Sequence, residues 1–143
     1  MWNNKDGLFK AYASLNVHGQ GLDPAQITLL LGIHPNQESV SNGFGAWTYS
    51  TRDRIDHLLP LEDHIAHLLD VFDPKAAALQ QIQKQFSTRV FCYFASQSDL
   101  DGFKLRSKTL GRLADLRLDL DVDEYFCCGE TTEPETRGWK SRR

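Results

Sequence analysis

The segment TRVFCYFAS, Thr88–Ser96, constrains the fold of this chain more than any other. It is rich in β-branched and aromatic residues and almost continuous in hydrophobicity, which favours a β-strand in a central position of a sheet. We expect such a strand to be covered on both faces, with Cys92 as a small buried apolar side chain. The rest of the chain therefore has to supply neighbouring strands and covering helices.

Three further segments have the two-residue period that is typical of strands: Leu8–Val17, Ala46–Thr51 and Leu116–Phe126. A short strand is also expected at Gly102–Leu105. The turn His18–Gly21 ends the first strand, and the polar, glycine-bearing segment Asn36–Gly45 is predicted to be a loop. Together with Thr88–Ser96, these strands can form one sheet.

Capping signals mark the start of three helices, with predicted N-caps at Asp23, Asp73 and Ser107. Pro24 takes the first position of the first helix, and Gly32 lies just past its end. Between residues 61 and 86 the apolar residues recur with a helical period, which Pro74 interrupts. This segment therefore predicts two consecutive helices or one long kinked helix.

These elements predict an α+β fold: a single-layer, mainly antiparallel sheet of about four to six strands, with helices packed on one face and ferredoxin-like character. LDPAQITLLLGI and LRSKTLGRLADL align at their apolar positions, which is consistent with two strand–helix–strand units. With 143 residues, the chain fits one domain, predicted over residues 1–128. Residues 129–143 are predicted to form a mobile C-terminal tail.

Composition favours a cytoplasmic protein. No stretch approaches the roughly 20 apolar residues of a membrane helix, and the N-terminus lacks the apolar region and cleavage site of a secretory signal. The three cysteines are an odd number and include the adjacent pair Cys127 and Cys128, which fits a reducing compartment. A net charge of -3 argues against nucleic acid as the main partner.

The order and spacing of several motifs identify a family resemblance. The motifs are AYASL followed by LDPAQITLLLGIHP, a glycine-containing loop with AWTYST, then LEDHIAHLLDVFDP, VFCYFAS and GFKLRSKTLGRLADLRLDLDVDEYF. Over Phe9 to Phe126 the chain resembles the bacterial Domain of Unknown Function 4279 family. The resemblance implies a fold and a bacterial source, and it implies no activity, cofactor or catalytic residue.

An acidic row, formed by Asp119, Asp121 and Asp123, alternates with Leu120 and Val122 in the last predicted strand. The three carboxylates share one face at a spacing of about 6.6 Å. The favoured interpretation is a solvated face that discourages sheet-to-sheet aggregation. The alternatives are a face that binds a basic partner and, less favoured, a Mg²⁺ or Ca²⁺ site completed by ligands from elsewhere. We therefore assign no metal.

Trp47 and Tyr49 share one face of the predicted strand Ala46–Thr51. Core packing is the favoured interpretation, because aromatic side chains dominate protein cores. If the preceding loop leaves that face open, the two rings become a partner-binding surface, since tryptophan and tyrosine are enriched in interface hot spots. Both residues are therefore candidates for partner binding.

Histidines form the remaining candidate group, since His64 and His67 are neighbours on a predicted helix and His57 precedes them. Zinc sites need more ligands than this pair supplies, and the HExxH pattern is absent. The GxSxG, GxxxxGK[ST] and GxGxxG patterns are absent as well. We therefore assign no catalytic residue and no cofactor.

The preferred functional hypothesis is a non-catalytic bacterial binding protein, in its most specific form an immunity-type protein that occludes a basic toxin through the acidic row. One alternative is a small enzyme or ligand-binding sensor with a pocket near His57, His64 and His67. A second alternative is a homo-oligomeric structural module that pairs through an edge strand. The sequence leaves the oligomeric state open.

Overall fold

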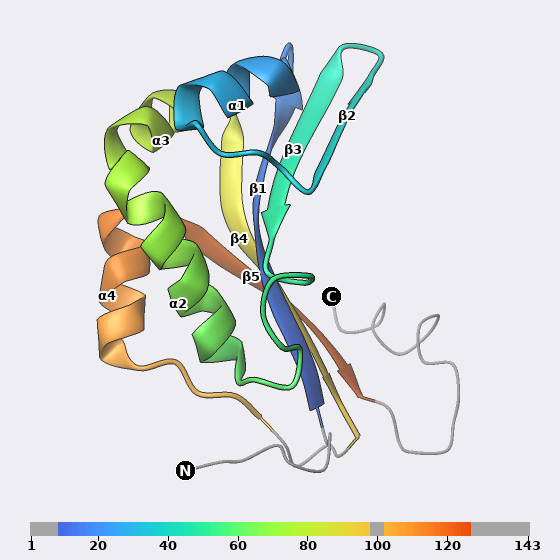
Figure 1. Cartoon of the computed structure of the whole chain (residues 1–143), viewed down its shortest axis with the longest axis vertical. Coiled ribbons are helices and arrows are strands. Elements are labelled where there is room, and N and C mark those ends of the chain that lie inside the picture. Colours follow the sequence, from blue (N-terminus) through green and yellow to red (C-terminus); the bar gives the residue numbers. More distant parts are fainter. Residues whose placement is uncertain (1–8, 98–101, 127–143) are drawn as a thin grey trace.

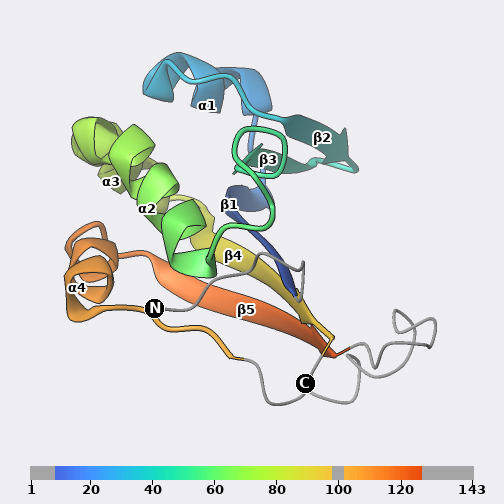
Figure 2. The same cartoon turned by 60° about the horizontal axis from the view of Figure 1, so that its bottom comes forward.

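A five-stranded sheet with the strand order β2-β3-β1-β4-β5 forms the framework of the computed structural model, which describes residues 9–97 and 102–126. Helices α1 to α4 lie on one side of this sheet (Figures 1 and 2). The elements are β1 (Phe9–Gln20), α1 (Pro24–Leu31), β2 (Gln37–Ser41), β3 (Phe44–Ser50), α2 (Leu61–Phe72), a 3₁₀ turn (Asp73–Lys75), α3 (Ala76–Gln83), β4 (Ser87–Ser96), α4 (Ser107–Asp115) and β5 (Asp119–Phe126). Strands β4 and β5 run parallel, and the other neighbouring strands are antiparallel. The predicted α+β fold with helices on one face is confirmed. The predicted tail lies outside the described residues.

The hairpin β2–β3 replaces the predicted loop Asn36–Gly45, so that prediction is wrong. Asn42 and Gly43 have φ values of 53° and 80°, the left-handed conformations that a two-residue turn between antiparallel strands requires. Strand β2 is exposed along its whole length, which explains its polar sequence. The first strand is also longer than predicted, because β1 stays paired with β3 as far as Gln20.

Helix α1 confirms the predicted caps. The Asp23 side chain accepts a hydrogen bond from the backbone N–H of Ala25 at 3.1 Å. Gly32 adopts a φ of 69° and donates its N–H to the carbonyl of Thr28 at 2.7 Å. The segment from residue 61 also forms two consecutive helices, α2 and α3, with Pro74 in the 3₁₀ turn between them.

The two other predicted caps are wrong. The Asp73 carboxylate accepts a hydrogen bond from the Arg112 guanidinium of α4 at 2.7 Å, and no side chain caps α3. Helix α4 takes its cap from Glu62 of α2, which accepts hydrogen bonds from the Arg106 N–H at 2.6 Å and from the Thr109 hydroxyl at 2.7 Å. Contacts between distant elements therefore replace the local caps.

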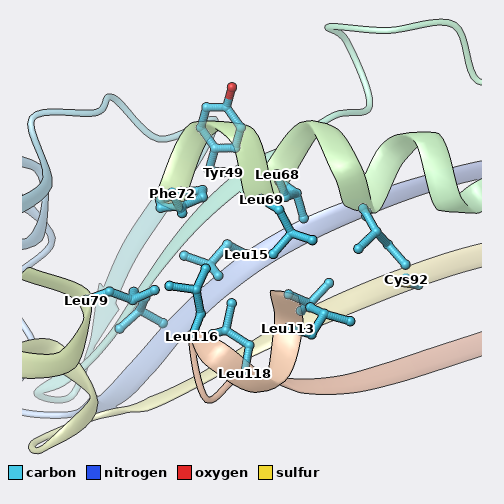
Figure 3. Packing of buried hydrophobic residues seen from close by; sticks show 14 of the residues in the cluster. Leu15, Tyr49, Leu68, Leu69, Phe72, Leu79, Cys92, Leu113, Leu116 and Leu118 are labelled. Atoms are coloured by element: carbon cyan, nitrogen blue, oxygen red, sulfur yellow. The ribbon is translucent and has the colours of Figure 1, made fainter. Parts of the chain in front are cut away.

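The core lies between the helices and one face of the sheet (Figure 3). Strand β4 contributes Val90, Cys92 and Phe94 to it, which confirms the buried thiol. Phe91 and Tyr93 of the same strand point to the opposite face and are partly exposed, so the predicted cover on both faces is wrong. The predicted strand Gly102–Leu105 is also wrong, because this segment leads irregularly into α4.

Among residues 9–97 and 102–126, no helix combines the length and apolar character needed to cross a bilayer.

Candidate functional site

The face of the sheet opposite the helices, called the open face below, carries the candidate site. Figure 2 shows the described helices on the other side of the sheet. Paired residues of neighbouring strands share a face, so the register places a set of partly exposed and exposed side chains there. These residues are Tyr12 of β1, Arg89, Phe91 and Tyr93 of β4, and Asp119, Asp121, Asp123 and Tyr125 of β5.

A row of three tyrosine rings crosses the open face from β1 to β5. The rings of Tyr12 and Tyr93 are stacked, with centroids 5.0 Å apart and an interplanar angle of 14°. The ring of Tyr125 lies 5.0 Å from that of Tyr93 at 42°. The guanidinium of Arg52 sits over the Tyr12 ring at 5.4 Å. These contacts fix the rings, so the row is a preorganised aromatic surface.

Arg89 connects the acidic row to Phe91 on the open face. Its guanidinium donates a hydrogen bond to Asp121 Oδ2 at 2.7 Å and lies 5.2 Å from the centre of the Phe91 ring. Its Nε and the Oδ1 of Asn16, at the opposite position of β1, are the two buried side-chain atoms for which the described part of the chain holds no hydrogen-bond partner. The pair thus retains unused hydrogen-bonding capacity.

The acidic row lies where the sequence predicts it, on one face of the edge strand β5. Asp119 and Asp121 are exposed, and Asp123 is half-buried. Leu120 and Val122 between them pack against the core. Arg89 compensates the charge of Asp121, so the row of three carboxylates keeps a smaller net negative charge.

Trp47 and Tyr49 face the helices and belong to the core. The buried indole of Trp47 donates its N–H to the Thr28 hydroxyl at 3.0 Å. The Tyr49 hydroxyl lies 3.3 Å from His67 Nε2, and its ring meets Phe72 edge-on. Core packing, the favoured interpretation, is confirmed for both. Since both side chains are buried, we leave both residues out of the proposed interface.

His64 is also fully buried, and it belongs to an internal chain of hydrogen bonds. Its Nδ1 lies 2.6 Å from the Thr51 hydroxyl, which accepts the N–H of Ala13 at 3.0 Å. Its Nε2 lies 3.1 Å from the carbonyl oxygen of Asp56. A carbonyl only accepts, so Nε2 carries a proton, and in the neutral ring Nδ1 accepts the hydrogen bond of the Thr51 hydroxyl. Burial lowers the pKa of His64 to about 4, against a smaller opposite effect of the Asp56 hydrogen bond. This chain joins β1, α2 and the segment between β3 and α2.

The three histidines do not converge on one cavity. His67 contacts Tyr49, and His57 is exposed and uses its backbone carbonyl to accept the N–H of Ala11. Two surface clefts, of about 620 and 550 Å³, are lined by other residues. In the larger cleft, Glu62 is already hydrogen-bonded to the start of α4. Within the described ranges, no three histidine, cysteine or acidic side chains gather as metal ligands do.

The tyrosine row is the part of the site that sequence reasoning missed. Tyr12 lies on the polar face of an alternating strand, where its neighbours on the same face are Lys10 and Ser14. Phe91 and Tyr93 alternate with the buried residues of β4, but their apolar character was interpreted as a sign of burial. Phe91 and Tyr93 could have been found from the aromatic residues that recur at every second position of β4. That alternation points to a binding face only when the helices are known to cover the other face of the sheet.

Comparison with known proteins gives a family and no functional relative. No curated protein and no solved structure matches the chain. The family described as Domain of unknown function (DUF4279) matches residues 9–127, which include strands β1 to β5 and helices α1 to α4 of the described part of the chain. The chain therefore belongs to this family.

Proposed function

We propose that the protein is a non-catalytic binding protein that engages a basic protein partner with its open face. One observation carries the proposal: the exposed carboxylates of Asp119 and Asp121 lie on the same face of the sheet as the tyrosine row, with Asp123 between them and Tyr125 along β5. Tyrosine and arginine are the residues that most often anchor protein interfaces. Acidic groups at the rim of such an anchor speed the encounter with a basic partner.

In its most specific form, the proposal is an immunity-type protein of the bacterial cytoplasm that occludes a basic toxin. The open face supports this form because it is a broad surface with charges at its edge. The buried histidine His64 and its neighbour His67 support it as well, because both ring nitrogens of His64 and the Nε2 of His67 are engaged in internal hydrogen bonds.

The combined substitutions Asp119→Asn and Asp121→Asn are expected to slow association with the partner about tenfold at low ionic strength, and to flatten its salt dependence. The matched control combines Asp63→Asn and Asp115→Asn, which remove the same charge from exposed positions on α2 and α4. The three proteins are used as baits in the source lysate at low and high salt. Association rates with a captured protein are then measured by surface plasmon resonance.

The proposed partner is a basic protein that the wild type and the control retain at low salt and the Asp119/Asp121 variant loses. A protein captured equally by all three baits contradicts the proposal. Capture of nucleic acid in place of a protein, or of no salt-sensitive protein, contradicts it too.

A further inference from the structure

The sheet has two outer edges with opposite character, β2 and β5 (Figure 1). If two copies of the protein paired through β5, the exposed Asp119 and Asp121 would place like charges against each other. Strand β2 is exposed at all five positions and carries one charge, that of Glu38. A second copy therefore meets a repulsive edge at β5 and an accessible one at β2.

The turn fixes which backbone groups of β2 point outward. A two-residue hairpin closes on a hydrogen-bonded pair, here Ser41 with Phe44, and hydrogen-bonded pairs then recur at every second residue. Ser39 and Ser41 therefore direct their N–H and C=O groups toward β3. Glu38 and Val40 direct theirs away from the sheet.

We propose that two copies of the protein pair antiparallel through β2, about a two-fold axis at Ser39, to form one continuous sheet. In this register Glu38 and Val40 of each copy exchange N–H and C=O groups with Val40 and Glu38 of the other, which gives four hydrogen bonds. The single charged residue then faces a valine instead of its own copy. The strand is therefore self-complementary in both hydrogen bonding and charge.

Exposed apolar side chains on and beside β2 also favour pairing with a second copy of the protein. Val40 is 60% exposed, and Leu29 on the adjacent helix α1 is 75% exposed. Val40 lies next to the proposed axis, where pairing removes apolar surface from water. The contact is small, so we expect a dissociation constant of roughly 10 µM to 1 mM. The open face is not used, so this inference is independent of the proposed function.

Disulfide trapping tests the register. Ser39 forms a non-hydrogen-bonded pair with its own copy, with Cα atoms about 4.5 Å apart, which a disulfide spans. Ser41 is equally placed on the strand, but its copy lies about 14 Å away along the strand direction. In a background with Cys127→Ser and Cys128→Ser, we expect Ser39→Cys to give a covalent dimer under mild oxidation and Ser41→Cys to stay monomeric. Equal cross-linking of the two variants, or none by Ser39→Cys, overturns the register.

Analytical ultracentrifugation of the full chain from about 5 µM to 1 mM tests the dimer itself. We expect the mass to rise toward twice the monomer mass, and Val40→Pro to abolish that rise. This proline removes an outward N–H without breaking the β2–β3 pairing, so circular dichroism should show a folded chain. A wild-type mass that stays monomeric at 1 mM overturns the proposal. Growth beyond the dimer overturns it too, because it indicates pairing of β2 with β5 in an open chain.

Discussion

Replacing Gly45 with alanine is expected to lower the free energy of unfolding by about 3 kcal/mol or more. A Cβ atom at this buried position would overlap the carbonyl oxygen of Leu22 and lie 2.9 Å from its carbonyl carbon. These are backbone atoms of the segment that leads from β1 into α1, so no change of side-chain rotamer relieves the overlap. Urea denaturation followed by circular dichroism measures the loss.

Gly111→Ala is the matched control for this substitution. Gly111 lies in α4, and a Cβ atom there meets nothing within 4 Å. Alanine has the higher helix propensity, so this variant should be more stable by about 0.5–1 kcal/mol. A Gly45→Ala protein as stable as the wild type would show that the chain before α1 does not cross the sheet as closely as the structure has it.

Elements defined by local signals were the ones that could be predicted from the sequence. Asp23, Pro24 and Gly32 bound α1 because each acts within one turn of its own position. The same holds for the alternation of β5, which places Asp119 and Asp121 on one face. Such signals need no knowledge of the rest of the chain.

Features set by distant contacts could not be predicted in this way. The cap of α4 comes from Glu62, which precedes Arg106 by 44 residues, so a search for a local cap at Ser107 fails. The parallel pairing of β4 with β5 likewise depends on the path of α4 across the sheet. Strand β2 is different, because its turn signal, Asn42–Gly43, is present in the sequence and was outweighed by the polarity of the strand.

The candidate site also has one part that local signals predict and one part that depends on the whole fold. The acidic row follows from alternation, whereas the tyrosine row follows from which face the helices leave uncovered. Continuous hydrophobicity in β4 has two causes, a buried face with Cys92 and Phe94 and an aromatic face with Phe91 and Tyr93. Hydrophobicity alone does not separate a buried face from a partly exposed aromatic face, and the register does.

The open face and the β2 edge are separate surfaces, and their tests fail independently. Asp119→Asn with Asp121→Asn leaves β2 unchanged, and Val40→Pro leaves the tyrosine row unchanged. A dimer through β2 would present two open faces on one continuous sheet. Binding to a partner with two equivalent sites would then gain from avidity.

Acidification from pH 7 to pH 4 is expected to cost the fold about 3 kcal/mol through His64 alone. Its pKa is lowered from 6.5 to about 4 in the folded protein, chiefly by burial. Between these pH values the unfolded chain binds a proton that the folded chain does not, so stability rises with pH across this window. The contribution is fully present above pH 6.5 and is lost as the pH falls toward 4.

The measurement compares unfolding free energies of the wild type and His64→Gln from pH 7.5 to 4. The variant is less stable at pH 7, because Gln supplies at most one of the two hydrogen bonds to Thr51 and Asp56. Its deficit should shrink with acidity, by up to about 1.4 kcal/mol per pH unit, since the variant has no imidazole to protonate. His67→Gln, on the same helix but only half-buried, controls for the loss of a histidine. A deficit that stays constant down to pH 4, or an NMR titration of folded His64 near pH 6.5, would show that burial does not keep the ring neutral.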